Sequence, residues 1–363
     1  MSKIFRLLLL VIILGGLLFG IKNWLGDVRP AILPPSSNNN SQRAIFARNL
    51  GNARDLEFSP GGTLLVSVPA FGHVLALPDK NSDNQADQNK VILSNLDRPH
   101  GLAFYKNKLF VAEEEMVVRY FWDEEKLAAK QDKVLFSLPK GGRHFTRTIA
   151  FNKKGEMFVS IGSSCDVCEE KHPWLASVIV SDSEGNNPRL FSRGLRNSVF
   201  ITLNPQTDKI WATEMGRDFL GDNLPPDEIN ILEENHDYGW PRCYGNRIPD
   251  TKFDASLGKN DCTNTQAPLY EICAHCAPLG LTFTPEGDLL VALHGSWNSS
   301  VPVGYKIIKL KVEENKITSQ EDFMADFLQG DQVSGRPVDL IFDKAGDLYI
   351  SDDKSGVIYK VIK

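Results

Sequence analysis

Residues 281–292 read LTFTPEGDLLVA, and five other segments of the chain repeat the same pattern. In each copy, an apolar residue, any residue and Phe or Leu are followed by a turn rich in Pro, Gly, Asn, Asp and Lys. An apolar run that ends in a small residue comes next. Two short apolar runs on either side of such a turn predict a β-hairpin. The other copies occupy residues 56–67, 102–112, 149–160, 201–213 and 340–351.

The spacing of these hairpins predicts how they assemble. Most copies start about one β-propeller blade apart, because a four-stranded blade takes roughly 40 to 50 residues. The wider gap between residues 201 and 281 predicts an insertion of about thirty residues between the fourth and fifth hairpins. A closed ring of blades leaves no exposed sheet edge and needs no capping repeats, unlike a sandwich or a solenoid. We therefore expect an all-β fold, a six-bladed β-propeller.

The composition supports a folded protein and excludes one class of partner. Of the 363 residues, 42% are hydrophobic and 24% are charged, which is typical of a globular domain with a large core. The net charge of −6 and the lack of a basic block in the sequence argue against nucleic-acid binding.

The N-terminal sequence predicts export. Basic residues near the start precede an apolar run over residues 7–21, which resembles a secretory signal. Residues 1–25 are expected to be a signal peptide or a retained membrane anchor, and both alternatives stay open. Residues 26–44 are rich in Pro, Ser and Asn and predict a flexible linker. Residues 45–363 would then form the propeller outside the cytoplasm, in the periplasm or at the outer side of the inner membrane.

The six cysteines predict disulfides, since an even count in an exported chain favours pairing. Proximity in the sequence suggests the pairs Cys165–Cys168, Cys243–Cys262 and Cys273–Cys276. Zinc binding by the two CxxC pairs is the alternative, although these pairs lie about a hundred residues apart. His follows neither CxxC, so the sequence does not indicate covalent haem attachment, and a separate electron acceptor would be needed for redox chemistry.

Hairpin geometry predicts where polar residues gather. The residue before a hairpin's first strand and the residue after its second strand lie at the same end, so a ring brings these positions to one mouth of the channel. The residues at these positions include Arg54, His100, Glu113, Arg143, His144, Arg196, Asn197, Glu214, Arg217, His275, His294, Trp297, Arg336 and Asp353. Arg offers paired donors to carboxylates and Trp offers a stacking face, so an anionic, planar ligand is favoured. The alternative is that they are ordinary loop residues.

Six short motifs resemble those of a known family. They are RPHGLAF (98–104), RHF (143–145), GLRNS (194–198), DEIN (227–230), YGWP (238–241) and GRPVD (335–339). In this order they resemble the quinoprotein glucose/sorbosone dehydrogenases, which use pyrroloquinoline quinone (PQQ) and calcium. The resemblance runs from about residue 45 to the C-terminus. HGSWN at 294–298 and the residues around Cys165 look closest to the L-sorbosone dehydrogenase branch.

The resemblance implies a catalytic residue and a cofactor site. His144 would be the general base that removes a proton from the sugar hydroxyl, because a neutral imidazole suits that task. Hydride would pass from the sugar carbon to the quinone. The residues that would hold the quinone are Arg196, Asn197, Arg336, His294 and Trp297.

The resemblance also implies calcium. One ion would lie at the quinone and be held partly by the backbone carbonyls of Gly216 and Arg217, as a Lewis acid. A second, structural ion would use Glu228 and the backbone of Tyr238, since oxygen ligands suit this hard cation. In DEIN, a carboxylate that caps backbone N–H groups in a turn is the alternative.

Three places depart from the family's pattern. Ser163 stands where the soluble glucose dehydrogenase branch has an Asp that supports the histidine, and Met215 stands where that branch has a quinone-contacting Gln. A cofactor-contacting Lys has no counterpart, because His294, Ser296 and Trp297 occupy that loop. These departures imply an altered quinone pocket and a different sugar-like substrate.

The function expected from the sequence is therefore a PQQ- and calcium-dependent dehydrogenase of an aldose or a sugar-derived, sorbosone-like aldehyde. Its partners would be a small sugar and a separate electron acceptor, a cytochrome or a quinone. A lactonase-like calcium propeller hydrolase, in which a central metal activates water, is the second candidate. A non-catalytic binding propeller is the third, because fold alone does not determine function.

Overall fold

The computed structural model describes residues 43–140 and 142–363, and its regular structure consists almost entirely of strands. The predicted signal or anchor segment and nearly all of the predicted linker lie outside the described residues. Within 43–140 and 142–363, no helix is long and apolar enough to cross a membrane.

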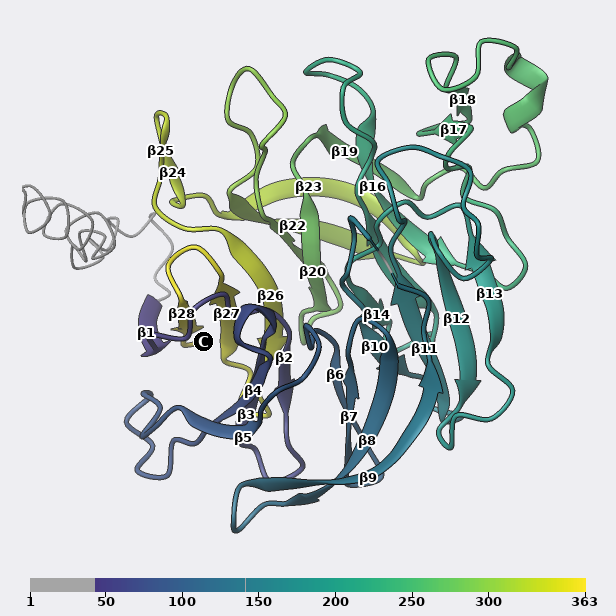
Figure 1. The fold of residues 1–363 in the computed structure, drawn as a ribbon. Coiled ribbons are helices and arrows are strands. Elements are labelled where there is room, and N and C mark those ends of the chain that lie inside the picture. The colour runs from purple at the N-terminus through teal and green to yellow at the C-terminus, as the bar shows by residue number, and fades with distance from the viewer. Residues whose placement is uncertain (1–42, 141) are drawn as a thin grey trace, which may run out of the picture. The chain divides into compact units, whose positions relative to one another are not determined.

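Six antiparallel four-stranded sheets form the blades of a propeller (Figure 1). Blade one contains β2 (Leu56–Phe58), β3 (Leu64–Val68), β4 (His73–Leu77) and β5 (Lys90–Leu93). Blade two contains β6 (Leu102–Tyr105), β7 (Lys108–Ala112), β8 (Met116–Asp123) and β9 (Ala128–Ser137). Blade three contains β10 (Ile149–Phe151), β11 (Glu156–Ile161), β12 (Ser177–Asp182) and β13 (Arg189–Arg193).

The second half of the chain repeats this arrangement. Blade four contains β14 (Ile201–Leu203), β15 (Ile210–Glu214), β16 (Pro226–Leu232) and β19 (Tyr270–Ala274). Blade five contains β20 (Pro278–Phe283), β21 (Leu289–Leu293), β22 (Lys306–Glu313) and β23 (Lys316–Met324). Blade six contains β26 (Pro337–Phe342), β27 (Leu348–Asp352), β28 (Val357–Val361) and β1 (Arg43–Ala47). In every blade the predicted hairpin forms the two inner strands, so the predicted six-bladed fold is confirmed.

The ring closes through strands from the two ends of the described chain. The innermost strands contact one another in the cyclic order β2, β6, β10, β14, β20 and β26. β1 pairs antiparallel with β28 and becomes the outer strand of blade six (Figure 1). Because β1 begins at Arg43, the expected domain start at residue 45 falls inside this strand.

Short elements lie outside the blades. They are the 3₁₀ turns η1 (Pro69–Phe71) and η2 (Lys259–Cys262) and the two-residue strands β17 (Cys243–Tyr244), β18 (Ile248–Pro249), β24 (Leu328–Gln329) and β25 (Gln332–Val333). The predicted insertion lies within blade four, between β16 and β19, and contains β17, β18 and η2. The expected pairs Cys165–Cys168, Cys243–Cys262 and Cys273–Cys276 are all disulfides. The alternative of zinc at the CxxC pairs is therefore wrong, because a disulfide offers no thiolate.

The core lies between neighbouring blades. Trp211 of β15 is fully buried and meets the ring of Phe283, on β20 of the next blade, edge to face at 5.3 Å between ring centroids. Burying one large apolar side chain contributes about 1.5–3 kcal/mol, so these seams supply much of the stability.

Buried carboxylates also join the blades. Asp339 of β26 accepts a hydrogen bond from the backbone N–H of Leu56 on β2 (2.8 Å), and Asp55 accepts one from Leu102 on β6 (3.3 Å). These acids satisfy N–H groups of the innermost strands, where an unpaired buried donor would be costly. Asp339, the last residue of GRPVD, therefore has a structural role.

Candidate active site

A cavity of about 240 Å³ lies at the mouth that the hairpin geometry predicts. Its lining residues are Arg143, His144, Arg196, Asn197, Met215, Gly216, Asp218, Asp227, His275, Ala277 and Trp297. Most come from loops before the first strand or after the second strand of blades three, four and five. Five of the predicted site residues meet here: His144, Arg196, Asn197, Gly216 and Trp297.

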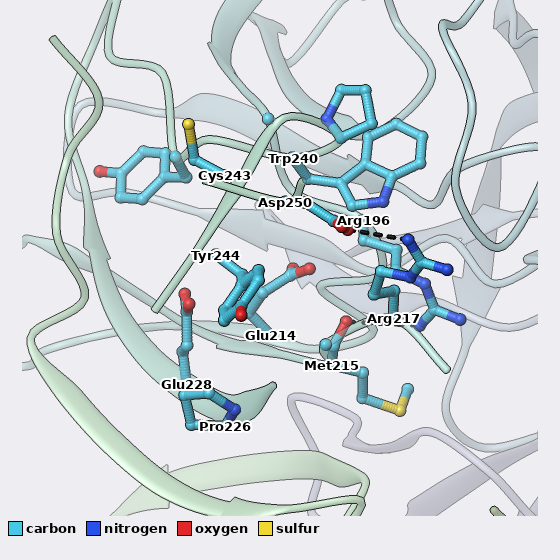
Figure 2. Close-up of a pocket in the computed structure, with 14 residues that line it drawn as sticks. Arg196, Glu214, Met215, Arg217, Pro226, Glu228, Trp240, Cys243, Tyr244 and Asp250 are labelled. Atoms are coloured by element: carbon cyan, nitrogen blue, oxygen red, sulfur yellow. Dashed lines mark hydrogen bonds and ion pairs between the residues drawn. The ribbon is translucent and has the colours of Figure 1, made fainter. Parts of the chain in front are cut away.

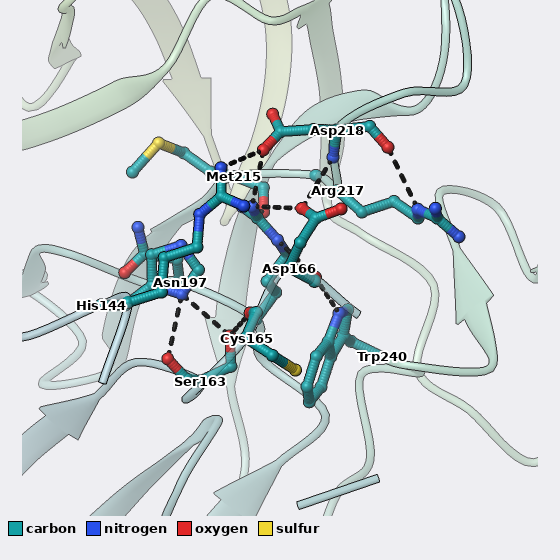
Figure 3. A network of polar contacts seen from close by, with 12 residues as sticks. His144, Ser163, Cys165, Asp166, Asn197, Met215, Arg217, Asp218 and Trp240 are labelled. Carbon is teal, nitrogen blue, oxygen red and sulfur yellow. Dashed lines mark hydrogen bonds and ion pairs between the residues drawn. The ribbon is translucent and has the colours of Figure 1, made fainter. Parts of the chain in front are cut away.

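Hydrogen bonding fixes the tautomer of His144 (Figure 3). The Ser163 hydroxyl donates to the backbone carbonyl of Cys165 (2.6 Å), so its oxygen is left to accept from the Nδ1–H of His144 (2.8 Å). The carbonyl oxygen of Ser163 lies 3.1 Å from the same nitrogen and can only accept. Nδ1 therefore carries the proton, and the neutral ring keeps a free lone pair on Nε2.

The surroundings of His144 keep it neutral. Burial lowers its pKa to about 3, and the nearby guanidinium groups of Arg196 and Arg143 add to the effect by repelling a second positive charge. Near neutral pH the ring is therefore an acceptor at Nε2. Ser163, where the resemblance implies an Asp, holds the ring with a hydroxyl and a carbonyl instead of a carboxylate.

Arg196 is held firmly in the wall of the cavity. Its guanidinium donates to the carboxylate of Asp166 (2.7 Å) and to the backbone carbonyl of the same residue (2.9 Å). It also donates to the carboxylate of Asp218 (3.4 Å) and to the carbonyl of Met215 (3.3 Å). These contacts from three directions place a positive charge beside His144 in one orientation.

Arg143 and two aromatic rings form the outer rim. Arg143 pairs with Asp218 (2.7 Å), and its guanidinium lies 5.5 Å from the ring centroid of Trp297. Phe219 meets Trp297 edge to face at 5.8 Å. Trp297 is 62% exposed, so its indole is available to a ligand at the mouth.

Asn197 contributes an acceptor without a partner. Its side-chain Oδ1 is buried and has no hydrogen-bond partner among the described residues, while its backbone N–H donates to Glu214 (3.0 Å). A Cβ on Gly162 would lie 2.9 Å from this oxygen and 2.6 Å from the Cβ of His144, so Gly162 leaves the room that both side chains occupy. A buried oxygen of this kind is expected to meet a donor from a ligand.

A second, much smaller cavity of about 20 Å³ adjoins the first (Figure 2). The two share Arg196, Met215 and Gly216. The other residues that line it are Gly194, Glu214, Arg217, Pro226, Glu228, Tyr238, Trp240, Pro241, Cys243, Tyr244 and Asp250. Arg217, Glu228 and Tyr238, all predicted calcium residues, therefore lie here and not at the larger cavity.

Carboxylates face one another across the sheet at this cavity. Glu228 on β16 is in register with Glu214 on β15 and with Glu271 on β19. Burial, with a smaller contribution from neighbouring carboxylates, raises the pKa of Glu214 to about 8 and that of Glu228 to about 7. Asn230 donates to Glu228 (2.9 Å), while its own Oδ1 is buried without a partner among the described residues. The carboxylate oxygens of Glu214 and Glu228 could hold a cation, which would replace the protons that burial favours.

Side-chain contacts limit the roles of two of these residues. The guanidinium of Arg217 pairs with Asp250 (2.8 Å), and the phenol of Tyr238 donates to the carbonyl of Ile231 (2.6 Å). What Arg217 and Tyr238 would offer a cation is therefore a backbone carbonyl, as the resemblance implies.

Arg336 and His294 line neither of these two cavities. Arg336 donates to the backbone carbonyls of His294 (3.0 Å) and Gly295 (2.8 Å), which ties blade six to blade five. His294 pairs with Asp353 (2.8 Å), and burial lowers its pKa to about 4. The structure does not bring them together with His144, and their role at a cofactor stays a prediction.

Sequence reasoning did not select Asp166 and Asp218. Asp166 lies between the cysteines of a CxxC pair, whose pattern predicts a disulfide or zinc and no role for the residue between, and Asp218 follows Arg217 without a motif of its own. Arg143 was recognised at the mouth but not assigned a role. An arginine beside the proposed base was the one signal that could have singled it out.

The chain is a six-bladed propeller in which His144, Arg143 and Arg196 line one cavity at a channel mouth. A family model described as TrAA12-like matches residues 35–363. The chain belongs to the TrAA12-like family. This confirms the resemblance to quinoprotein sugar dehydrogenases at the level of the family, whereas the sorbosone branch stays a prediction.

Two individual relatives cover most of the chain. An uncharacterised protein of Borreliella burgdorferi is 32% identical over 295 residues, which cover 74% of this chain and 77% of that protein. A PQQ-dependent sugar dehydrogenase of Hypocrea jecorina is 23% identical, covering 87% of this chain and 86% of the relative.

A solved structure shows the same fold. The holo form of the PQQ domain of pyranose dehydrogenase from Coprinopsis cinerea has a TM-score of 0.79 and 21% identity, covering 93% of this chain and 99% of that domain. The chain spans 48% of the full length of the curated pyranose dehydrogenase from that organism.

Proposed function

We propose that the protein is a PQQ- and calcium-dependent dehydrogenase of an aldose or a sugar-derived, sorbosone-like aldehyde. The observation that carries the proposal is His144, whose Nε2 is unprotonated in a cavity walled by Arg143 and Arg196. The names of the relatives in Hypocrea and Coprinopsis support the cofactor and the substrate class.

The residues at the larger cavity fit a planar, anionic quinone. Arg143 and Arg196 supply positive charge for carboxylates, the buried Oδ1 of Asn197 can accept from an N–H or O–H donor, and Trp297 offers a ring face. His294 and Arg336 would act from the neighbouring blade. When bound, PQQ supplies the acceptor for a hydride from the sugar carbon.

His144 performs the proton transfer in this proposal. Its Nε2 accepts the proton of the sugar hydroxyl, while Nδ1–H remains bound to Ser163 and holds the ring in place. Burial, together with Arg196 and Arg143, disfavours the protonated ring, so Nε2 is unprotonated in the free protein.

Two places offer oxygen ligands to calcium: the smaller cavity, and the wall between the smaller and the larger cavity. Glu228 and Glu214 with the backbone of Tyr238 offer oxygen ligands to a structural ion, and the carbonyls of Gly216 and Arg217 offer them to an ion at the quinone. The raised pKa values of the two glutamates fit carboxylates that a cation would deprotonate.

The cellular setting follows from the chain. Three disulfides suit an oxidising compartment, so we place the protein in the periplasm or an equivalent space. Residues 1–25 would direct export or anchor the chain in the inner membrane. The electrons would leave to a separate cytochrome or quinone.

The test is reconstitution of the full chain with PQQ and calcium, followed by dye-linked oxidation of aldoses and sugar aldehydes. Activity that needs both additions and is lost in EDTA supports the proposal. The absence of both PQQ binding and sugar turnover would refute the proposal. Lactone hydrolysis by the same preparation would favour the hydrolase.

A further inference from the structure

We propose that the disulfide-closed loop Cys165–Cys168 is the positioning unit of this active site, holding the base His144 and the wall arginine Arg196 in one geometry. Cys165, Asp166 and Ser163 are its positioning residues. Only the role of His144 as the base rests on the proposed function, because the contacts themselves are present in the free protein.

One contact path runs from the loop to the histidine (Figure 3). The backbone carbonyl of Cys165 accepts from the Ser163 hydroxyl, and the Ser163 oxygen in turn accepts from Nδ1 of His144. If the Cys165 carbonyl moved, the hydroxyl could turn and donate to Nδ1, in competition with the Ser163 carbonyl (3.1 Å) that also holds the Nδ1–H tautomer. The tautomer with Nε2 protonated cannot take a proton at Nε2.

A second path runs from the next residue of the loop to the arginine. The carboxylate of Asp166 accepts from Arg196 and from the backbone N–H of Asp218 (3.0 Å). The backbone carbonyl of Asp166 accepts from Arg196 and from the indole N–H of Trp240 (3.3 Å). Two consecutive carbonyl groups of one loop thus orient His144 and Arg196, which both line the cavity.

The disulfide explains how one loop can hold both His144 and Arg196 in place. A bond between residues three apart closes a very short loop, which limits what it contributes to global stability but restrains the local backbone. Glu170 reinforces the restraint, since its carboxylate accepts from the backbone N–H (2.6 Å) and the hydroxyl (2.8 Å) of Ser164. Small displacements of positioned groups are costly in catalysis.

The main test replaces the disulfide in the full chain by Cys165→Ser/Cys168→Ser. Ring ¹⁵N chemical shifts of the histidines, assigned with His144→Gln, report the tautomer of His144 without any cofactor. The wild type should show Nδ1–H, and the variant should populate the Nε2–H tautomer measurably. In the reconstituted enzyme, kcat should fall about 10- to 100-fold, as is usual for residues that orient an active group.

Two further variants separate the paths. Asp166→Asn removes the charge that holds Arg196 but keeps the disulfide, so the Kd for PQQ should rise about tenfold while the His144 tautomer stays unchanged. Glu169→Gln is the matched control directly after the loop: Glu169 pairs with Arg242 at the surface, and its loss should leave kcat within about twofold.

The outcomes are distinct. An unchanged His144 tautomer and an unchanged kcat in the double Cys variant would overturn the proposal, as would an equal loss of kcat in Glu169→Gln. If the double variant does not fold, Ser163→Ala and Asp166→Asn decide in its place, and normal kcat and PQQ affinity in both would overturn it. A wild type that never binds PQQ would refute the proposed function, while the tautomer measurement would still test the positioning unit.

Discussion

Replacing Glu214 by Gln should stabilise the calcium-free protein at pH 8 and destabilise the calcium-loaded protein at the same pH. Glu214 is buried, accepts from the Asn197 N–H (3.0 Å) and the Ser198 hydroxyl (2.6 Å), and lies in register with Glu228. The Gln side chain can keep both contacts, because its carbonyl accepts from Asn197 and its amide can donate to Ser198. The substitution therefore removes the charge and little else.

The magnitude follows from the raised pKa. Burial raises the pKa of Glu214 from 4.5 to about 8, so the folded protein keeps a proton that the unfolded chain releases. Folding stability must then fall as pH rises from 4.5 to about 8. Between pH 5 and pH 8 the loss is at most about 4 kcal/mol, at roughly 1.4 kcal/mol for each of the three pH units. For a domain of about 320 residues this corresponds to roughly 6 °C in Tm.

The assay is thermal unfolding at pH 5 and pH 8, in EDTA and in calcium. In EDTA, Glu214→Gln should match the wild type at pH 5 and melt several degrees higher at pH 8. In calcium at pH 8 the wild type should melt at the higher temperature, because calcium replaces the proton on Glu214 and stabilises the folded protein. Gln offers the ion no charged partner.

The matched control is Glu57→Gln on β2 of blade one. Burial raises the pKa of Glu57 to about 8 as well, but Glu57 does not line the smaller cavity. This variant should share the pH effect in EDTA and lack the reversal in calcium. Equal pH dependence of Glu214→Gln and wild type in EDTA would refute the reasoning on burial, and an equal calcium response would refute the proposed ion.

Three further changes test other parts of the molecule. His144→Gln should lower kcat by at least about 100-fold with an unchanged Tm, because it removes the proposed base and not the fold; retained turnover would exclude His144 as the base. Trp297→Ala should weaken ligand binding but change the free energy of unfolding by less than about 0.5 kcal/mol, since the ring is exposed, as urea titration would show. Trp211→Ala should cost about 3–5 kcal/mol in the same titration, because it empties the seam between blades four and five, and a small loss would mean that Phe283 fills the space.

Much of the fold was predictable because its signal is local. Each inner hairpin spans about twelve consecutive residues, so its two strands and its turn can be predicted from that short segment alone. Ring closure was not predicted in detail, because β1 pairs with β28 from the other end of the described chain. There Arg43 donates to Asp326 (3.0 Å), 283 residues away, and its guanidinium lies over Tyr359. No short window of sequence contains such a contact.

The sequence by itself determined the six blades, the disulfide pairs that neighbour each other along the chain, and the mouth where His144, Arg196 and Asn197 meet. Only the tertiary structure decided which nitrogen of His144 is free, since that depends on the Ser163 carbonyl and on the orientation of the Ser163 hydroxyl toward Cys165. It also separated His294 and Arg336 from the cavity residues, because their side chains are bound to groups of neighbouring blades. Periodic patterns encode strands, whereas hydrogen-bond partners across blades depend on three-dimensional packing that no periodicity records.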